Sequence, residues 1–368
     1  MKCLTLAAGA AALLVSDAIA GTITSLGIDP VLGTFRTQFS NNQVSNDGAV
    51  VGFYQGGTSR AVYRSASGTT SLLGALPSAN GVDNSIARVI SADGSIIAGH
   101  AVGKAATWSA ATGSISALPN DPANSGNADA KGISDDGSTI VGWVYESALN
   151  TTVATRWTGA GRQLLGSLEA GRPSFAFGAT ADGATVVGYG GTSAGNRAFR
   201  WNATDGLTQL GMLAGATAST CGGISGDGST AFGTCTIAGK MRAVIWNSAG
   251  VATDLGLLQG GTMSYAQSCT ADGSMVFGGG DSSSGSKGFV WTAATGLMTL
   301  ETYLTNNGVD LTGWTELGGP ACSPNGQYLV GWGKYNGVSQ CFVAAVPAPG
   351  AIALLGIAGV ARGRRRRG

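Results

Sequence analysis

Carboxylates recur along this chain at a regular spacing and are the first candidates for chemistry. Each of six Asp residues follows a Ser or Thr and one variable residue, and precedes a Gly. Carboxylate oxygens are ligands that Ca²⁺ prefers, so a ring of them could hold calcium. Each Asp also has its own turn to stabilise through hydrogen bonds to nearby backbone, and no D-x-D-x-D loop is present, which favours turn formation. The six residues are Asp47, Asp93, Asp136, Asp182, Asp227 and Asp272.

Side chains for acid–base or nucleophilic catalysis are sparse. His100 is the only histidine, which argues against a His-based triad or a multi-histidine metal site, and we expect it to be solvated at a strand end. Glu146, Glu169, Glu301 and Glu316 share no spacing. A glycosidase pair stays geometrically possible, because a ring fold gathers distant loops, but nothing singles out two carboxylates. We therefore assign no catalytic, cofactor-binding or metal-binding residue.

Basic residues begin the third predicted strand in five of the repeated units. Faithful repetition would place them in a ring near one face, opposite the Asp turns. Such a ring could bind an anionic polymer through many weak contacts. The alternative is a set of solvated strand ends, whose charge Asp83, Asp121, Asp129 and Glu169 neutralise from nearby loops. The five residues are Arg60, Lys104, Arg197, Arg242 and Lys287.

The Gly of each turn counts the repeated units and predicts the fold. A period near 45 residues with strand patterning is typical of a closed ring of small sheets. The fourth unit shows four strands, at 177–180, 185–189, 197–201 and 207–211. We predict an all-β, seven-bladed β-propeller of four-stranded antiparallel blades. The turn glycines are Gly48, Gly94, Gly137, Gly183, Gly228, Gly273 and Gly326.

The two ends of the repeat region predict how the ring closes. The last unit stops after a third strand at 341–346, and residues 22–26 resemble the missing fourth strand. An N-terminal strand that completes the last sheet would hide two exposed edges. Large aromatic residues, such as Trp108 and Trp246, end the third strands and are expected to pack each sheet onto its neighbour. The pattern of residues 300–304 predicts one helical turn that caps the ring.

Two cysteines flank the fifth Asp-Gly turn. Counting outward from that turn places Cys221 and Cys235 opposite each other on adjacent strands, which makes them candidates for a disulfide in an exported chain. The other cysteines of the repeat region occupy positions that hold Ile, Val or Ala in other units, so we expect buried, apolar packing. They are Cys269, Cys322 and Cys341.

Both ends of the chain indicate export. Residues 1–20 read as a signal peptide cleaved between Ala20 and Gly21, and 21–346 form the propeller. Residues 347–368 contain Pro347, Ala348 and Pro349, then a short apolar run and five Arg. The run is too short to span a bilayer, which predicts transient membrane association; an unprocessed tail anchor is the alternative. Without those Arg the net charge of +1 becomes −4, which argues against nucleic acid as a partner.

Three features resemble known families. The segments 91–95, 197–201 and 206–211 are similar to the exported bacterial HAF repeat, although the name-giving His is absent. The tail resembles the PEP-CTERM sorting signal, which implies the export machinery and an exosortase-type protease as partners; Ala348 stands where that signal usually has Glu. The turn at 323–326 and the Trp-ended third strands are similar in layout to WD40 repeats.

These observations predict a protein of the cell envelope, cell surface or extracellular matrix. The favoured function is non-enzymatic binding, with envelope or matrix polysaccharide as the candidate ligand, and no cofactor. The alternative is an extracellular polysaccharide hydrolase or lyase. Two convergent carboxylates with raised pKa values at the central channel would favour the enzyme, whereas a channel lined by Ser, Thr and Gly would favour binding. A purely structural spacer is the third possibility.

Overall fold

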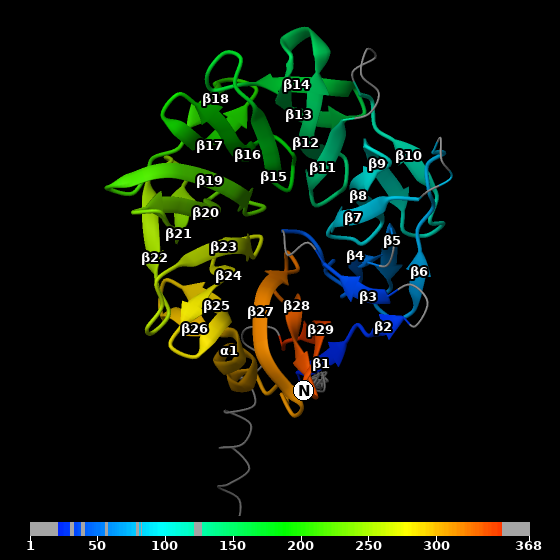
Figure 1. Cartoon of the computed structure of the whole chain (residues 1–368), viewed down its shortest axis with the longest axis vertical. Coiled ribbons are helices and arrows are strands. Elements are labelled where there is room, and N and C mark those ends of the chain that lie inside the picture. The colour runs from blue at the N-terminus through cyan, green and yellow to red at the C-terminus, as the bar shows by residue number, and fades with distance from the viewer. Residues whose placement is uncertain are drawn as a thin grey trace, which may run out of the picture.

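The protein folds as a closed ring of seven antiparallel sheets (Figure 1). The computed structural model describes residues 21–29, 33–37, 41–55, 58–78, 81, 83–120 and 127–347. Six sheets have four strands and the first has five, because a short extra strand precedes it. The ring confirms the predicted seven-bladed β-propeller.

In blades 2 to 6, strand order in the sheet follows chain order from the centre of the ring to its rim, whereas in blade 7 the N-terminal strand β1 is the outermost (Figure 1). Blade 1 contains β2 (Ile28–Asp29), β3 (Gly33–Arg36), β4 (Val50–Gln55), β5 (Ser59–Arg64) and β6 (Thr70–Leu72). Blade 2 contains β7 (Ser85–Ile90), β8 (Ile96–Ala101), β9 (Lys104–Ser109) and β10 (Ile115–Ala117). Blade 3 contains β11 (Ala128–Ile133), β12 (Ile140–Glu146), β13 (Thr151–Thr158) and β14 (Gly161–Gly166), with the short 3₁₀ turn η1 (Ser147–Leu149) before β13.

Blades 4 to 6 follow the same order, and blade 7 adds the N-terminal strand. Blade 4 contains β15 (Ser174–Ala179), β16 (Val186–Thr192), β17 (Gly195–Asn202) and β18 (Gly206–Gln209). Blade 5 contains β19 (Ala216–Ile224), β20 (Thr230–Ile237), β21 (Lys240–Asn247) and β22 (Ala252–Gly256). Blade 6 contains β23 (Ser264–Cys269), β24 (Met275–Ser282), β25 (Gly285–Thr292) and β26 (Gly296–Thr299). Blade 7 contains β27 (Trp314–Cys322), β28 (Tyr328–Tyr335), β29 (Val338–Ala345) and β1 (Thr22–Ser25).

The Asp-Gly turns join the first two strands of each blade and keep their own carboxylates occupied. In blade 4 the Thr180 hydroxyl donates to Asp182 Oδ1 at 2.6 Å, and the Ala184 N–H donates to the same oxygen at 2.9 Å. Gly183 has φ +64°, a conformation in which glycine carries no steric penalty. The same bonds recur in the other turns, with Asn325 in place of Asp in blade 7. The recurrent Asp residues are therefore turn residues, as the sequence predicts.

The N-terminal strand closes the ring as predicted. β1 pairs antiparallel with β29, so that Thr22 lies opposite Ala345 and Ser25 lies opposite Phe342. Apolar clusters fill the spaces between blades; the fully buried Trp108 belongs to one shared by blades 1 and 2, and its Nε1–H donates to the Gly74 carbonyl at 2.8 Å. The Trp residues that end the third strands are thus part of the core.

One α-helix packs beside the last two blades. Helix α1 (Leu300–Asn306) begins at Thr299, whose side chain accepts a hydrogen bond from the Thr302 N–H. Its apolar residues Leu300 and Leu304 are fully buried against blades 6 and 7. The helix confirms the predicted helical segment.

The proposed sorting segments lie mostly outside the described residues. Residues 1–20, with Ala20, and residues 348–368, with Ala348 and Pro349, are not among them, whereas Gly21 and Pro347 are. Within the described residues, no helix has the length and apolar character needed to cross a membrane.

Candidate functional site

In blades 2, 4 and 6 the inner strand leaves alternate side chains partly exposed. In β7, β15 and β23 the second and fourth residues are partly exposed, whereas the residues between them are buried. The fourth residue of these strands is a β-bulge, because pairing with the second strand skips it. Bulges commonly re-aim side chains next to functional sites. We call the partly exposed inner-strand residues, with their second-strand neighbours, the channel mouth.

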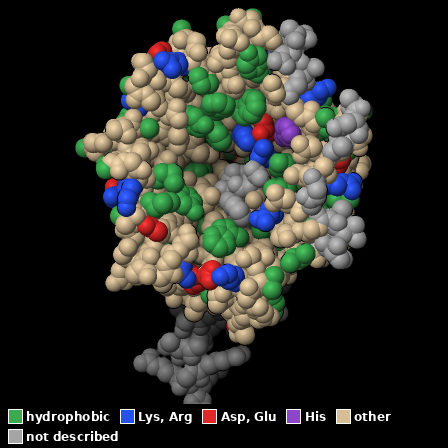
Figure 2. All heavy atoms as spheres, in the orientation of Figure 1, with side chains coloured by type: hydrophobic (Ala, Val, Ile, Leu, Met, Phe, Trp, Pro, Cys, Tyr) green, Lys and Arg blue, Asp and Glu red, His purple; other side chains and the backbone are tan. Residues whose placement is uncertain are grey.

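In blades 2 and 3 the channel mouth carries a cluster of charges. Asp129 on β11 lies between two cations: Arg88 Nε is 2.8 Å from its Oδ1, and Lys131 Nζ is 2.9 Å from its Oδ2. The three side chains are only 12%, 6% and 21% exposed for Arg88, Asp129 and Lys131. Burial lowers the pKa of Lys131, and the nearby Asp129 opposes that shift. Figure 2 shows these charges beside the single histidine, at the hollow in the middle of the ring.

His100 lies on β8 opposite Ile86, next to the charged cluster. Its Nε2 accepts a hydrogen bond from the Gly103 N–H at 3.1 Å, which stabilises the turn between β8 and β9. Burial lowers its pKa, and the cations Arg88 and Lys131 add to that effect while Asp129 opposes it. His100 is therefore a neutral, partly buried turn residue at neutral pH rather than a solvated strand end.

In blades 3 and 4 the channel mouth is aromatic. Trp143 meets Phe175 edge-on with ring centroids 6.1 Å apart. Tyr189 stacks on Phe177 at 5.5 Å and also contacts Phe175 at 5.3 Å. All four rings are partly exposed. They form a continuous apolar wall next to the charged cluster, and Figure 2 shows an apolar patch over this part of the ring.

Blades 5 and 6 place smaller or uncharged groups at the equivalent positions. In blade 5 these are Thr220, Gly222 and Thr234, and the two hydroxyls lie 2.8 Å apart. In blade 6 they are Tyr265 and Gln267. Charged and aromatic side chains of the channel mouth are therefore more numerous in blades 2 to 4 than in blades 5 and 6.

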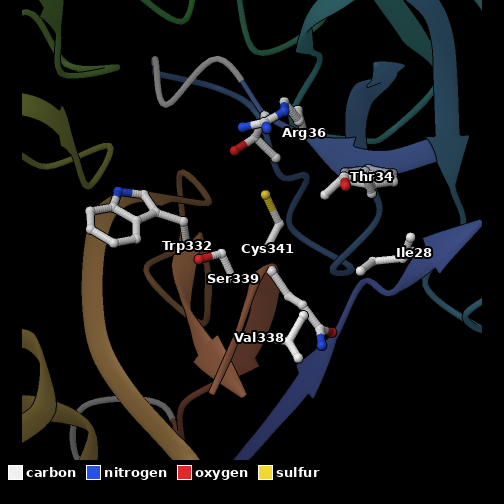
Figure 3. A pocket seen from close by; sticks show the side chains of 10 residues that line it. Ile28, Thr34, Arg36, Trp332, Val338, Ser339 and Cys341 are labelled. Atoms are coloured by element: carbon white, nitrogen blue, oxygen red, sulfur yellow. The ribbon is translucent and has the colours of Figure 1, made fainter. Parts of the chain in front are cut away.

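A cavity of about 640 Å³ lies where blade 7 meets blade 1. Trp332 on β28 and Arg36 on β3 line it, and Figure 3 shows them on different sides of the space with Cys341 between them. Gly318 faces Trp332 across the sheet, and a Cβ at this glycine would lie 2.6 Å from the indole. Glycine thus leaves room for the ring. Arg36 is exposed.

The end of the channel near the Asp-Gly turns is crossed by Asn41 and Asn42. The Asn42 side chain donates to the Ile133 carbonyl at 3.0 Å, and the Ser268 hydroxyl donates to Asn41 at 3.1 Å. These bonds reach blades 3 and 6 from blade 1. The space between the described residues there is only about 10 Å³.

The structure gives most of the five predicted basic residues local partners. Arg60 pairs with Asp83 at 3.3 Å, Arg242 with Asp254 at 2.7 Å, and Lys287 with Glu301 at 2.7 Å. Arg197 donates to the carbonyls of Ala194, Asn196 and Thr217. These contacts match the alternative of neutralised strand ends more closely than an anion-binding ring; Lys104 begins β9 as predicted. The ring stays a prediction.

The cysteine register differs from the predicted one. Cys221 lies opposite Gly233, and Cys235 lies opposite Ser219, so the two thiols are diagonal neighbours. Diagonal positions are about 7 to 8 Å apart, beyond the usual Cα separation of a disulfide. Both residues are buried with free thiols, and burial raises the pKa of Cys221 to about 12. The strands pair at the lower end of the expected range of alignments, which puts the two cysteines one diagonal step apart, and the disulfide stays a prediction. Cys269, Cys322 and Cys341 are buried, as expected.

The sequence interpretation used only Asp129 from the charged cluster and missed the aromatic wall. Aligning the units on the turn Asp would have found both. The residue seven positions after it is Tyr54, His100, Trp143, Tyr189, Thr234 or Gly279, and Trp332 follows Asn325 at the same distance. The residue five positions before it is the bulge in blades 2 to 6. The signal that could have identified the site is therefore the change of residue type at these two positions from one unit to the next.

Within the described residues, no group of three or more His, Cys, Asp or Glu side chains could hold a metal ion. No model of a protein family matches the sequence, and no curated protein matches it.

Solved structures match the fold at low identity. An oligogalacturonate lyase from Vibrio parahaemolyticus is 14% identical with a TM-score of 0.57, over 88% of this chain and 93% of that one. An oligogalacturonate lyase in complex with manganese is 13% identical with a TM-score of 0.56, over 89% and 97%. A putative TolB from Agrobacterium tumefaciens is 15% identical with a TM-score of 0.48, over 76% and 95%. This likeness shows the propeller fold alone.

Proposed function

We propose that the protein is an exported, non-enzymatic propeller of the cell envelope or extracellular matrix that binds polysaccharide at its channel mouth. The aromatic wall beside the charged cluster is the observation that supports this proposal most strongly. A sugar ring presents an apolar face of C–H groups and a polar edge of hydroxyls. Partly exposed aromatic rings can stack on the apolar face of the sugar, and fixed polar groups can hydrogen-bond to its hydroxyls.

The arrangement of the ends supports the export part of the proposal. The first strand of the ring begins at Thr22, directly after the proposed cleavage between Ala20 and Gly21. The last strand ends at Ala345, just before the proposed tail at Pro347. Removal of either segment would therefore leave every strand intact. Intact-mass measurement of the native protein tests this: we expect a new N-terminus at Gly21 and a shortened C-terminus, and an unshortened chain would contradict it.

A glycan array with the native protein tests the binding part. We expect Trp143→Ala to reduce the array signal about tenfold, because it removes the edge-on partner of Phe175. Met241→Ala is the control, since Met241 is an exposed apolar residue on the third strand of blade 5, outside the channel mouth, and it should bind as the unmodified protein does. Thermal unfolding confirms that both variants fold. A native protein that binds no glycan would overturn the proposal.

A polysaccharide lyase is the second candidate, and Lys131 is the observation that favours it. Burial lowers the pKa of the Lys131 amine, which makes it a better candidate for a base than an exposed lysine, and Arg88 could face the substrate carboxylate. The base would remove the proton beside the carboxylate, a C=C bond would form, and the glycosidic oxygen would leave. A two-carboxylate hydrolase lacks such support, because both oxygens of Asp129 already contact cations. Two of the fold neighbours are themselves named as lyases.

Ultraviolet absorbance distinguishes the two candidates. A lyase acting on a polyuronate produces an absorbing C=C bond, whereas a binding protein leaves the absorbance unchanged. We expect no increase with the native protein. An increase that Lys131→Met abolishes would replace the binding proposal with the lyase.

A further inference from the structure

We propose that the channel mouth selects acidic polysaccharides and holds one chain at two stations. This inference rests on the proposed binding function. The first station is the charged cluster with the aromatic wall, and the second is the cavity between blades 7 and 1. Each station combines an aromatic ring with a basic side chain, which suits a sugar that carries a carboxylate or sulfate.

At the first station, Asp129 fixes two cations without neutralising both. Arg88 and Lys131 each contact one of its oxygens, so the three groups together carry a net charge of +1. A lysine ammonium has three N–H donors, so the single bond to Asp129 does not saturate Lys131. Trp143 lies directly opposite Asp129 in the sheet and brings the aromatic wall beside the cluster. A sugar stacked on this wall would thus lie next to a fixed positive charge.

At the second station, the indole of Trp332 and the exposed guanidinium of Arg36 border one cavity (Figure 3). Its volume of about 640 Å³ suits a sugar unit or two, and polar side chains such as Ser339 contribute to the lining. Planar guanidinium groups bind carboxylates through two parallel hydrogen bonds. This cavity therefore offers the same combination of ring and cation as the first station.

The repeat places the two stations at one level of the ring. Trp143 and Trp332 occupy the same position of their units, seven residues after the turn Asp or Asn. Equivalent positions in a propeller lie at equal depth along the channel. One chain that enters the channel mouth can therefore meet both rings.

The charge distribution favours an anionic ligand. The repeat region carries a net charge of −4, yet Arg36, Arg88, Lys131 and Asp129 together contribute +2 around the channel mouth. Three basic residues nearer the rim pair with acids, namely Arg60, Arg242 and Lys287. A local positive potential on an acidic body steers an acidic chain to this opening and disfavours attachment elsewhere.

Affinity electrophoresis of the native protein through alginate, a polyuronate, and dextran, a neutral glucan, tests the selectivity. We expect at least tenfold stronger retardation by alginate, and weaker retardation as salt rises. Arg88→Gln and Arg36→Gln should each reduce retardation by alginate about threefold to tenfold. Lys240→Met, which removes an exposed cation at the start of β21 in blade 5, should leave the retardation unchanged. Arg88→Gln retains the Lys131–Asp129 contact, and thermal unfolding checks its fold.

Uronate oligomers of different length test the two stations. A hexamer should bind at least tenfold more tightly than a dimer, because it can occupy both stations, and Arg36→Gln should remove most of that gain. Equal binding of dextran and alginate would overturn the selectivity and leave the proposed function standing. An equal loss with Lys240→Met would show diffuse attraction and overturn the stations. A protein that retains neither polymer would overturn the proposed function itself.

Discussion

The two ends of the channel differ in how faithfully the seven units repeat. At the Asp-Gly end every unit uses the same few residues, and each carboxylate or amide oxygen accepts bonds from its own turn. At the channel mouth the equivalent positions hold an ion cluster, aromatic rings, two threonines or a tyrosine. The same backbone supports both ends.

This difference separates groups that maintain the fold from groups that remain available. A turn Asp bonded to a hydroxyl and a backbone N–H within its own segment has little left for a ligand. The side chains of the channel mouth contact each other across blades, and apart from the buried Asp129 they stay partly exposed. Repetition at one end therefore marks structure, and variation at the other end marks the candidate site.

Loss of the Asp129 charge should produce the largest effect on stability. Asp129→Asn leaves Arg88 and Lys131 as two neighbouring, largely buried cations, and we expect the free energy of unfolding to fall by about 3 kcal/mol. Asp254→Asn is the matched control, because its pair with Arg242 is short but about one-third exposed. That change should cost less than about 1 kcal/mol. Denaturant unfolding measures both, and equal losses would mean that the cluster contributes no more than a surface ion pair.

Replacement of a turn glycine should have the next largest effect. Gly183 has φ +64°, and a Cβ there would lie 2.5 Å from the Cβ of Thr139 in the neighbouring blade. Gly183→Ala combines backbone strain with this collision, and we expect a loss of about 2 to 3 kcal/mol. Gly239 has φ +76° with no atom within 4 Å of the added carbon, so Gly239→Ala should cost only the strain, about 1 kcal/mol. Equal losses of unfolding free energy would contradict a tight contact between neighbouring turns.

The sequence predicted the fold well because its signals are local. An Asp-Gly turn specifies a hairpin through bonds inside a few residues, and its recurrence counts the blades. The pairing of β1 with β29 was also predictable, because residues 22–26 match a strand that the last unit lacks. Trp108 and its counterparts were also predictable as core residues, because large aromatic residues recur at one position of the repeat.

The candidate site was less predictable because it depends on contacts between blades. Arg88 and Asp129 are far apart in the chain and meet only when β7 and β11 stand side by side. Periodicity assigns both to inner strands but does not show which side chains remain exposed. The position of the β-bulge determines which side chains remain exposed. No single residue type identifies that position, because it is Arg, Lys, Phe, Gly or Gln in blades 2 to 6. The register of Cys221 and Cys235 was hard to predict for a similar reason, because it depends on how the two strands pair.

Removal of a turn carboxylate should lower the free energy of unfolding by about 1 kcal/mol. Asp182→Ala loses the bonds from the Thr180 hydroxyl and the Ala184 N–H. Asp182→Asn should retain most of the stability at neutral pH, because Asn325 accepts the equivalent bonds in blade 7, at 2.6 Å from the Ser323 hydroxyl and 3.0 Å from the Gln327 N–H. Neither variant should change glycan binding at the channel mouth. A change in binding with intact folding would show that the turn end contributes to the site.

Lowering the pH should produce the smallest of these effects, and it should destabilise the fold both through Asp281 and through the turn residue Asp182. Hydrogen bonds from the Thr262 hydroxyl and from the Thr262 and Met263 N–H groups lower the pKa of Asp281 from 3.8 to about 2. A carboxyl whose pKa is lower in the folded state stabilises the fold above its unfolded pKa, and that contribution is lost as pH falls from about 4 to about 2. The hydroxyl of Thr180 and the Ala184 N–H lower the pKa of Asp182 in the same direction.

Asp281→Asn should therefore unfold at a lower temperature than the unmodified protein at pH 7, and the difference should shrink toward pH 2. The loss is small because Asp281 is exposed and solvent screens its charge. Thermal unfolding at a series of pH values measures it, with Asp182→Asn as the comparison from the turn end. A difference that stays constant with pH would mean that the bonds to Asp281 do not depend on its charge. Carboxylates held by their own loops would then act only as hydrogen-bond acceptors, and Asp129, held between two cations, would be the one whose charge matters.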